Sequence, residues 1–186
     1  MSTPIQFQLH PEKAIEAAAV LLKLHGNPMK YLALLKMLYI ADRVALARMD
    51  QPITGDQYVS MDYGPVLSGV YDLIKGKPVA ALPLWSKFIS HRNGMFVDLL
   101  DDPGNEDLCQ EEEEILQQVY QEFGQLDPFH IVEWTHTLPE WQDPHGSCIP
   151  ITVEDILKNL GKSDEEIAEI QQESSREAYL DGVLSA

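Results

Sequence analysis

The chain has 186 residues, of which 45% are hydrophobic, and a formal net charge of −17 at pH 7. This length suits one domain with a substantial core and an appendage, and the hydrophobic content excludes a disordered protein. The sequence contains no run of about 18 apolar residues, and no basic segment followed by an apolar stretch opens it. We therefore expect a cytoplasmic protein without a membrane span.

The charge is divided unevenly along the chain. Residues 1–97 hold ten Lys and Arg against seven Asp and Glu, whereas residues 98–186 hold three against 23. Such a negative excess opposes approach to a phosphate backbone, so we do not expect nucleic acid as a partner. An acidic half suits a basic protein partner, and it equally suits a solvated surface that keeps the chain soluble.

Two helices are predicted near the N-terminus, over about residues 11–25 and 29–49. Pro11 fits the first turn of the first helix, and Gly26-Asn27-Pro28 ends it. Its expected buried face is Ala14, Ile15, Ala18, Leu21 and Leu22, and its expected solvent face is Glu12, Lys13, Glu16 and Lys23. The second helix is apolar on nearly all sides apart from Lys36, which is typical of a helix at the centre of a core.

A connector and a third helix are predicted next. Gln51-Pro52 and Thr54-Gly55-Asp56 supply turn residues after the second helix. Pro65 is expected at the first position of the new helix, where a missing N–H costs nothing. The apolar stripe of this helix would comprise Val66, Val70, Leu73 and Ile74.

Alternation replaces the helical pattern after Gly76-Lys77-Pro78. Apolar and polar residues alternate within residues 85–90 and again within residues 95–100, and Asn93-Gly94 lies between the two segments. This pattern predicts a β-hairpin with a type I′ turn. Helices followed by such a hairpin indicate a mainly α fold, with a helical core and a small β-hairpin. This order is compatible with a winged-helix topology.

The second half of the sequence predicts four more helices. One spans about residues 111–124 and opens on Glu111 to Glu114, which suit its N-terminal dipole. Another runs from Asp127-Pro128 to about residue 135. From Ile149 the chain resembles an appendage, with helix starts at Thr152 and Ser163. We therefore divide the chain into a domain at 1–150 and an acidic C-terminal helical extension at 151–186.

Two groups of residues in the sequence are of types that can bind a metal ion. His130 and His136, with Glu133 between them, would lie about 120° apart around a helix, whereas helical metal ligands usually share one face. Cys109 and Cys148 lack CxxC spacing and are expected as free thiols, buried or half-buried. The sequence thus predicts neither a metal site nor a cofactor.

No catalytic residues are predicted. Asp42, Asp56 and Asp62 lie near the connector and could in principle perform acid–base chemistry, but turn capping accounts for them more simply. No Gly-rich phosphate loop and no nucleophile motif occurs in the sequence. We therefore expect a binding protein and not an enzyme.

A series of motifs in the chain resembles the Panacea antitoxin domain family, which includes SocA-like and GepA-like proteins. The motifs are Leu38-Tyr39-Ile40-Ala41-Asp42, Pro52-Ile53-Thr54-Gly55-Asp56-Gln57-Tyr58, Tyr63-Gly64-Pro65-Val66 with Val70-Tyr71, and Thr135-His136 with Pro139 and Trp141. Their order and spacing cover roughly residues 10–145. One departure is that residues 137–140 read Thr-Leu-Pro-Glu, where the family typically has a more Gly- and Ser-rich linker.

The resemblance implies an antitoxin of a bacterial or phage toxin–antitoxin system, which neutralises a co-encoded toxin by direct protein–protein binding. Two alternatives remain open. One is a winged-helix transcription regulator, and the other is an adaptor that delivers a bound protein to an ATP-dependent protease, as SocA-like members are thought to do. The candidate partner-binding or motif residues are Tyr39, Asp42, Gly55, Asp56, Tyr58, Tyr63, Gly64, Pro65, Val66, Tyr71, Arg92, His136 and Trp141.

Overall fold

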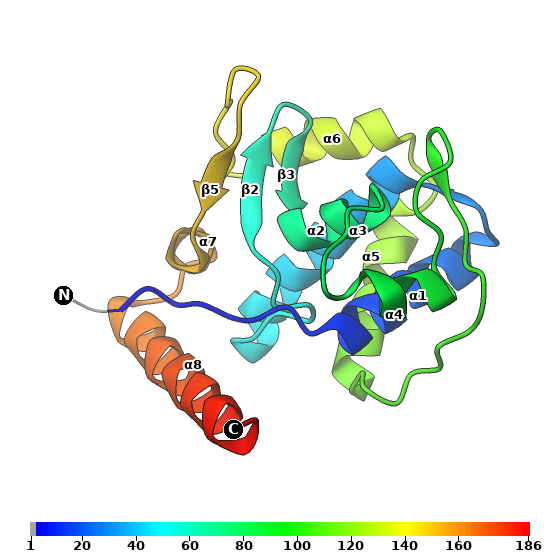
Figure 1. Cartoon of the computed structure of the whole chain (residues 1–186). Coiled ribbons are helices and arrows are strands. Elements are labelled where there is room, and N and C mark those ends of the chain that lie inside the picture. The colour runs from blue at the N-terminus through cyan, green and yellow to red at the C-terminus, as the bar shows by residue number, and fades with distance from the viewer. Residues whose placement is uncertain (1–2) are drawn as a thin grey trace.

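The computed structural model describes residues 3–186, which form eight helices and five short strands. The helices are α1 (Pro11–His25), α2 (Tyr31–Met49), α3 (Ser68–Ile74), α4 (Leu82–Phe88), α5 (Gln110–Phe123), α6 (Pro128–His136), α7 (Val153–Asn159) and α8 (Asp164–Leu184). The strands are β1 (Met29–Lys30), β2 (Tyr58–Met61), β3 (Gly64–Leu67), β4 (Phe96–Val97) and β5 (Ile149–Ile151). The predicted mainly α fold with a small β-hairpin is confirmed (Figure 1).

Helix α2 is the centre of the core, as its apolar surface predicts. It packs against α1, α5, α6 and β3, and Leu34, Met37 and Leu38 in its middle are buried. The boundaries of α1 follow its local signals, since Pro11 lies in its first turn and Gly26 ends it in the left-handed conformation at φ 87°. Within residues 3–186, no helix combines the length and hydropathy needed to cross a membrane.

The hairpin of the fold lies at residues 58–67, where the sequence predicted the start of a helix. Strands β2 and β3 pair antiparallel, with Tyr58 opposite Leu67 and Ser60 opposite Pro65. The expectation that Pro65 opens a helix is therefore wrong, and α3 begins at Ser68. Strand β3 is an edge strand, which tolerates a residue without a backbone N–H.

Residues 85–100 form a looser pair than the predicted hairpin. Most of the first predicted strand is helix α4, which buries Trp85, and only the Ile89–Leu99 bridge links the two segments before the turn. The turn itself is shifted by one residue, because Asn93 and Phe96 exchange both backbone hydrogen bonds around Gly94 and its successor. Positive φ occurs at Gly94 alone in this turn, which matches type II′ and not type I′.

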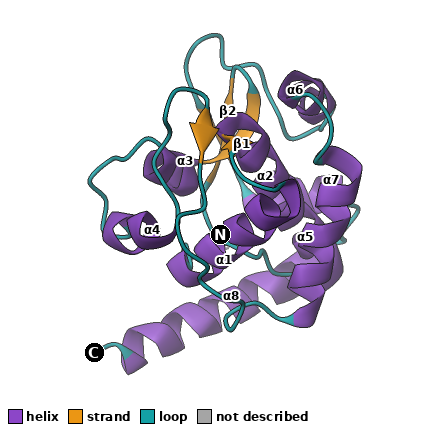
Figure 2. Cartoon of the chain, turned by 90° about the vertical axis from the view of Figure 1, so that its right-hand side faces the viewer, coloured by secondary structure: helices purple, strands orange, loops and turns teal. Residues whose placement is uncertain are grey.

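The C-terminal segments pack against the rest of the chain and share its hydrophobic core. Strand β5 pairs with β2 and completes a sheet in the order β3-β2-β5, with Ile151 opposite Tyr58. Helix α7 buries Ile156 and Leu157 in the core. Helix α8 opens on the predicted capping box of Ser163 and Glu166 and runs along one side of the body (Figure 2).

Two glutamates and both cysteines differ from their expected exposure. Glu16 is buried, and its carboxylate accepts hydrogen bonds from the backbone N–H groups of residues 107 and 108. Glu112 is buried too and pairs with Lys13 Nζ at 2.7 Å. Both face the contact between α1 and α5, which helical periodicity alone cannot reveal. Cys109 and Cys148 are free thiols, as expected, but they are exposed.

Candidate functional site

Asp42 holds the connector between α2 and β2. Its Oδ1 accepts the backbone N–H groups of Ile53 at 3.0 Å and Thr54 at 2.9 Å. Its Oδ2 accepts the hydroxyls of Thr54 at 2.6 Å and Tyr58 at 3.0 Å. Complete burial raises the pKa of Asp42 to about 6, against the hydrogen bonds, which lower it. The carboxylate therefore fixes a turn and does not face a ligand.

Asp56 has a similar role at the start of α3. Its carboxylate accepts the backbone N–H groups of Gly69 at 3.1 Å and Val70 at 2.8 Å, which are free donors in the first turn of α3. Burial raises the pKa of Asp56, and these hydrogen bonds oppose that effect. Asp62 lies apart at the hairpin turn, where it accepts the N–H of Gly146 at 2.9 Å. The three carboxylates hold different turns and do not converge on one ligand.

A buried ion pair ties the loop after α6 to α2. Glu140 Oε1 accepts hydrogen bonds from the Tyr39 hydroxyl at 2.9 Å and from Arg43 Nε at 2.6 Å. The Tyr39 ring packs edge-on against Tyr58, with ring centroids 5.6 Å apart. Tyr39 and Tyr58 thus belong to the scaffold beneath the hairpin. Glu140 lies in the segment where the sequence departs from the family's usual linker.

The hairpin rests directly on α2 and α6 at Gly64. This residue has φ +95°, and a Cβ atom there would lie 2.5 Å from Thr135 Oγ1 and 3.1 Å from Lys36 Nζ. Lys36 is fully buried, and its Nζ donates to the carbonyl of Pro65 at 2.7 Å. Burial lowers the pKa of Lys36 to about 7. Only glycine fits both the backbone conformation and the close approach at position 64.

Two aromatic residues hold the turn of the hairpin. The rings of His136 and Trp141 stack with centroids 4.0 Å apart. Trp141 Nε1 donates to the carbonyl of Met61 at 2.9 Å, and His136 Nε2 lies 3.1 Å from the carbonyl oxygen of Asp62. His136 thus acts as a turn support. Within the described residues 3–186, no group of three His, Cys, Asp or Glu residues is arranged to hold a metal ion.

A cavity of about 220 Å³ lies beside the hairpin, between α2, α3 and the loop at residues 146–147. We call it the tyrosine pocket, because Tyr31, Tyr63 and Tyr71 line it together with Lys36 and Val66. The rings of Tyr31 and Tyr71 stack with centroids 6.3 Å apart. Three of the predicted site residues therefore meet in this cavity, namely Tyr63, Val66 and Tyr71.

Two cations lie against the outer tyrosines of the pocket. The Arg92 guanidinium is 5.4 Å from the Tyr31 ring centroid, and its Nη1 donates to the Tyr31 hydroxyl at 3.2 Å. Lys75 Nζ lies 4.0 Å from the Tyr71 ring centroid. These contacts place Arg92, a candidate partner-binding residue from the sequence, next to the motif residues of the tyrosine pocket.

An aromatic pair projects from the same side of the molecule. Tyr63 at the hairpin turn and Phe129 in the first turn of α6 pack edge-on, with ring centroids 5.9 Å apart. Tyr63 is 60% exposed and Phe129 is 53% exposed. Exposed aromatic residues in a well-held turn are typical of anchors for a protein partner.

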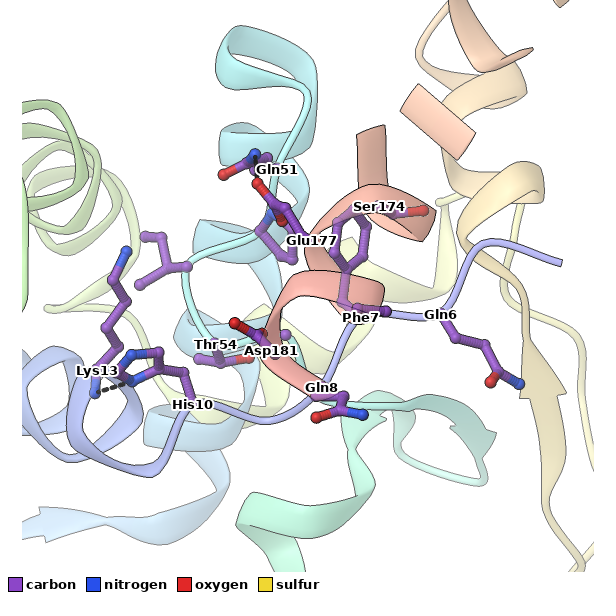
Figure 3. Close-up of a pocket in the computed structure, with 14 residues that line it drawn as sticks. Gln6, Phe7, Gln8, His10, Lys13, Gln51, Thr54, Ser174, Glu177 and Asp181 are labelled. Carbon is purple, nitrogen blue, oxygen red and sulfur yellow. Dashed lines mark hydrogen bonds between the residues drawn. The ribbon is translucent and has the colours of Figure 1, made fainter. Parts of the chain in front are cut away.

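A second cavity, of about 170 Å³, lies between the N-terminal segment, the connector and α8. Figure 3 shows Phe7 and His10 on the N-terminal segment, with Glu177 and Asp181 reaching in from α8. Gln51 Nε2 donates to Glu177 Oε1 at 3.0 Å. The cavity thus lies between the acidic extension and the connector, and the hydrogen bond from Gln51 to Glu177 links the two segments.

The N-terminal segment also explains the glycine of the connector. Gly55 has φ +73°, and a Cβ atom there would collide with the backbone carbonyl of Gln8. The chain passes so close at this point that His10 N–H donates to the carbonyl of Thr54 at 2.8 Å. Gly55 is therefore required by packing and backbone conformation together.

The structure divides the predicted site residues into two groups. The buried scaffold comprises Tyr39, Asp42, Gly55, Asp56, Tyr58, Gly64, Pro65 and Val66, and the partly or fully exposed group comprises Tyr63, Tyr71, Arg92, His136 and Trp141. Sequence reasoning did not include Tyr31, Lys36 and Phe129 among the site residues. The one signal in the sequence was Lys36, a single charge within an otherwise apolar stretch of helix.

The chain was compared with protein-family models, curated proteins and solved structures. The family model "Antitoxin SocA-like, Panacea domain" matches residues 34–142, which is more than half of the chain. No curated protein and no solved structure matches it. The matched range runs from the middle of the core through the connector, the hairpin and Trp141, so it contains the hairpin's scaffold and most of the tyrosine pocket. The chain therefore belongs to the SocA-like Panacea domain family of antitoxins.

Proposed function

We propose that the chain is the antitoxin of a toxin–antitoxin pair and that it neutralises its toxin by direct contact. Membership of an antitoxin family supports an antitoxin-type role. The observation that carries the contact surface is the exposed aromatic pair of Tyr63 and Phe129. Aromatic residues are enriched among the few interface positions that supply most of the binding free energy.

The support beneath this pair favours tight binding. Trp141 and His136 bind the backbone of the turn that carries Tyr63, and Gly64 seats the turn on α2 and α6. A surface that is already ordered loses little conformational entropy when a partner binds. The buried motif residues would then contribute to neutralisation indirectly, by holding the contact surface in place.

The test uses the product of the neighbouring gene as the candidate toxin. We expect co-expression of this chain to restore growth, and we expect the double variant Tyr63→Ala/Phe129→Ala to lose rescue and copurification. Each truncation is expected to weaken binding by roughly 1–2 kcal/mol, or about five- to thirtyfold. The matched control is Tyr179→Ala, because Tyr179 is an exposed aromatic residue on α8.

Folding must be measured in parallel. The double variant and Tyr179→Ala are both expected to melt at the same temperature as the parent chain, because Tyr63, Phe129 and Tyr179 are all exposed. Rescue that survives in the double variant but fails in Tyr179→Ala would move the toxin surface to the C-terminal extension. Absence of rescue by the parent chain with every neighbouring gene product would refute the antitoxin proposal itself.

A further inference from the structure

Two basic side chains, Lys36 and Arg92, lie in or beside the tyrosine pocket, in a chain of net charge −17. Lys36 forms part of its wall, and Arg92 lies against Tyr31. Within residues 3–186, neither cation is paired with a carboxylate, whereas Lys75 is paired with Asp72. The pocket therefore has one basic group in its wall and one beside it, neither of them in a salt bridge within the described residues, and one carboxylate, Asp62, in the same wall.

Lys36 is the more unusual of the two. A buried amine is ordinarily paired or fully hydrogen-bonded, because removing a charge from water is costly. Among the described residues, Lys36 Nζ has the carbonyl of Pro65 as its hydrogen-bond acceptor, which satisfies one of the three N–H groups of an ammonium. An anion near the pocket wall would stabilise the protonated form of this amine.

The remaining wall is suited to a flat apolar group. Tyr31, Tyr63 and Tyr71 contribute their rings, and Leu35 and Val66 contribute aliphatic surface. An engineered apolar cavity of about 150 Å³ accepts benzene. A cavity of about 220 Å³ therefore has room for one ring and a short acidic substituent.

The geometry points to the tyrosine pocket as a binding site for a small organic anion with a flat apolar body, such as an arylalkanoic acid. The tyrosine rings contact the body, while Lys36 and Arg92 supply the field that favours the negative charge. Asp62 also lines the cavity, where its carboxylate accepts a hydrogen bond from Gly146 N–H. Its negative charge opposes a bound anion, so the attraction of Lys36 and Arg92 must outweigh it. The pocket shares Tyr63 with the proposed toxin surface, but its ligand binding is measured on the isolated chain and needs no toxin.

Three matched probes test the charge requirement by isothermal titration calorimetry on the full chain. They are 3-phenylpropionate, 3-phenylpropanol and 3-phenylpropylamine, which share a ring and differ in charge. We expect the carboxylate to bind at least about tenfold more tightly than the alcohol, and the amine not to bind. Titration near pH 7.5 in two buffers of different ionisation enthalpy should also show proton uptake by Lys36 on binding.

Variants then assign the effect to the two cations. Lys36→Met keeps the apolar stem and should abolish proton uptake and weaken carboxylate binding about tenfold, and Arg92→Gln should weaken it without changing proton uptake. Lys87→Met is the control, because Lys87 is exposed and does not line the pocket. Equal affinity for the carboxylate and the alcohol, no detectable carboxylate binding, or unchanged binding in both cation variants would each overturn the proposal. Arg92→Gln decides the matter if Lys36→Met does not fold.

Discussion

Substitution of Asp42 by Asn separates the charge of this side chain from its shape. An Asn oxygen can still accept the backbone N–H groups of Ile53 and Thr54. The amide NH₂ would face the hydroxyls of Thr54 and Tyr58, which can accept as well as donate. We therefore expect Asp42→Asn to fold with the connector intact and to lose only the titration of a buried carboxylate.

The sign of the effect follows from the raised pKa of Asp42, which burial moves from 3.8 to about 6 in the folded chain. The folded state then binds more protons than the unfolded state between these values, so the free energy of unfolding falls as the pH rises through about 6. The full shift of about two pKa units corresponds to roughly 3 kcal/mol. About 1 kcal/mol of it is expected between pH 5 and pH 8, a range in which most carboxylates remain ionised.

Urea unfolding at a series of pH values measures this difference. The free energy of unfolding of the parent chain minus that of Asp42→Asn should fall by about 1 kcal/mol from pH 5 to pH 8, because all other titrations cancel in the difference. Glu133→Gln, at an exposed position of α6, should show no such trend. A flat difference for Asp42→Asn would mean that the hydrogen bonds fully offset burial, a reversed trend would mean that they outweigh it, and either result would refute the reasoning.

Three further predictions concern the hairpin and the acidic half. Gly64→Val should lower the free energy of unfolding by about 1–3 kcal/mol in urea titrations, because a side chain would collide with Thr135 in a backbone conformation closed to β-branched residues. Neutralising the exposed Glu111 and Glu114 should slow toxin association in stopped-flow measurements and weaken its salt dependence. Truncation after Gly161 should leave a cooperatively folded domain by circular dichroism, with stability lower by roughly 3 kcal/mol through lost apolar burial; non-cooperative melting would contradict this.

The segments of the fold that could be predicted are those governed by local chemistry. The first helix begins and ends at its proline and glycine signals, and the capping box of Ser163 and Glu166 starts α8. Asp127 likewise caps α6 by accepting the N–H of Phe129. Each signal acts within a few residues of the backbone groups that it satisfies, so the sequence alone contains the whole interaction.

The segments that could not be predicted depend on distant partners. Strand β3 pairs with β2 and packs on α2 and α6, where Gly64 lies close to Lys36 and Thr135, although Pro65 favours a helix start. Similarly, Trp85 is buried by packing of α4 against α1, and its alternating neighbours resembled a strand. Tertiary contacts decided between two local conformations that the sequence supports about equally.

The same distinction bears on the site. Most motif residues are buried and hydrogen-bond or pack against one another, as Asp42 and Tyr58 do. A match to the motif therefore specifies how the hairpin is held in the fold. It carries little information about which partner the hairpin contacts. Phe129 lies outside the recognised motifs, is 53% exposed and packs against a motif tyrosine. Changes at such a position alter the contact surface at little cost to the fold, whereas changes at Asp42 act on folding first. One scaffold can therefore present different contact surfaces while its buried residues stay the same.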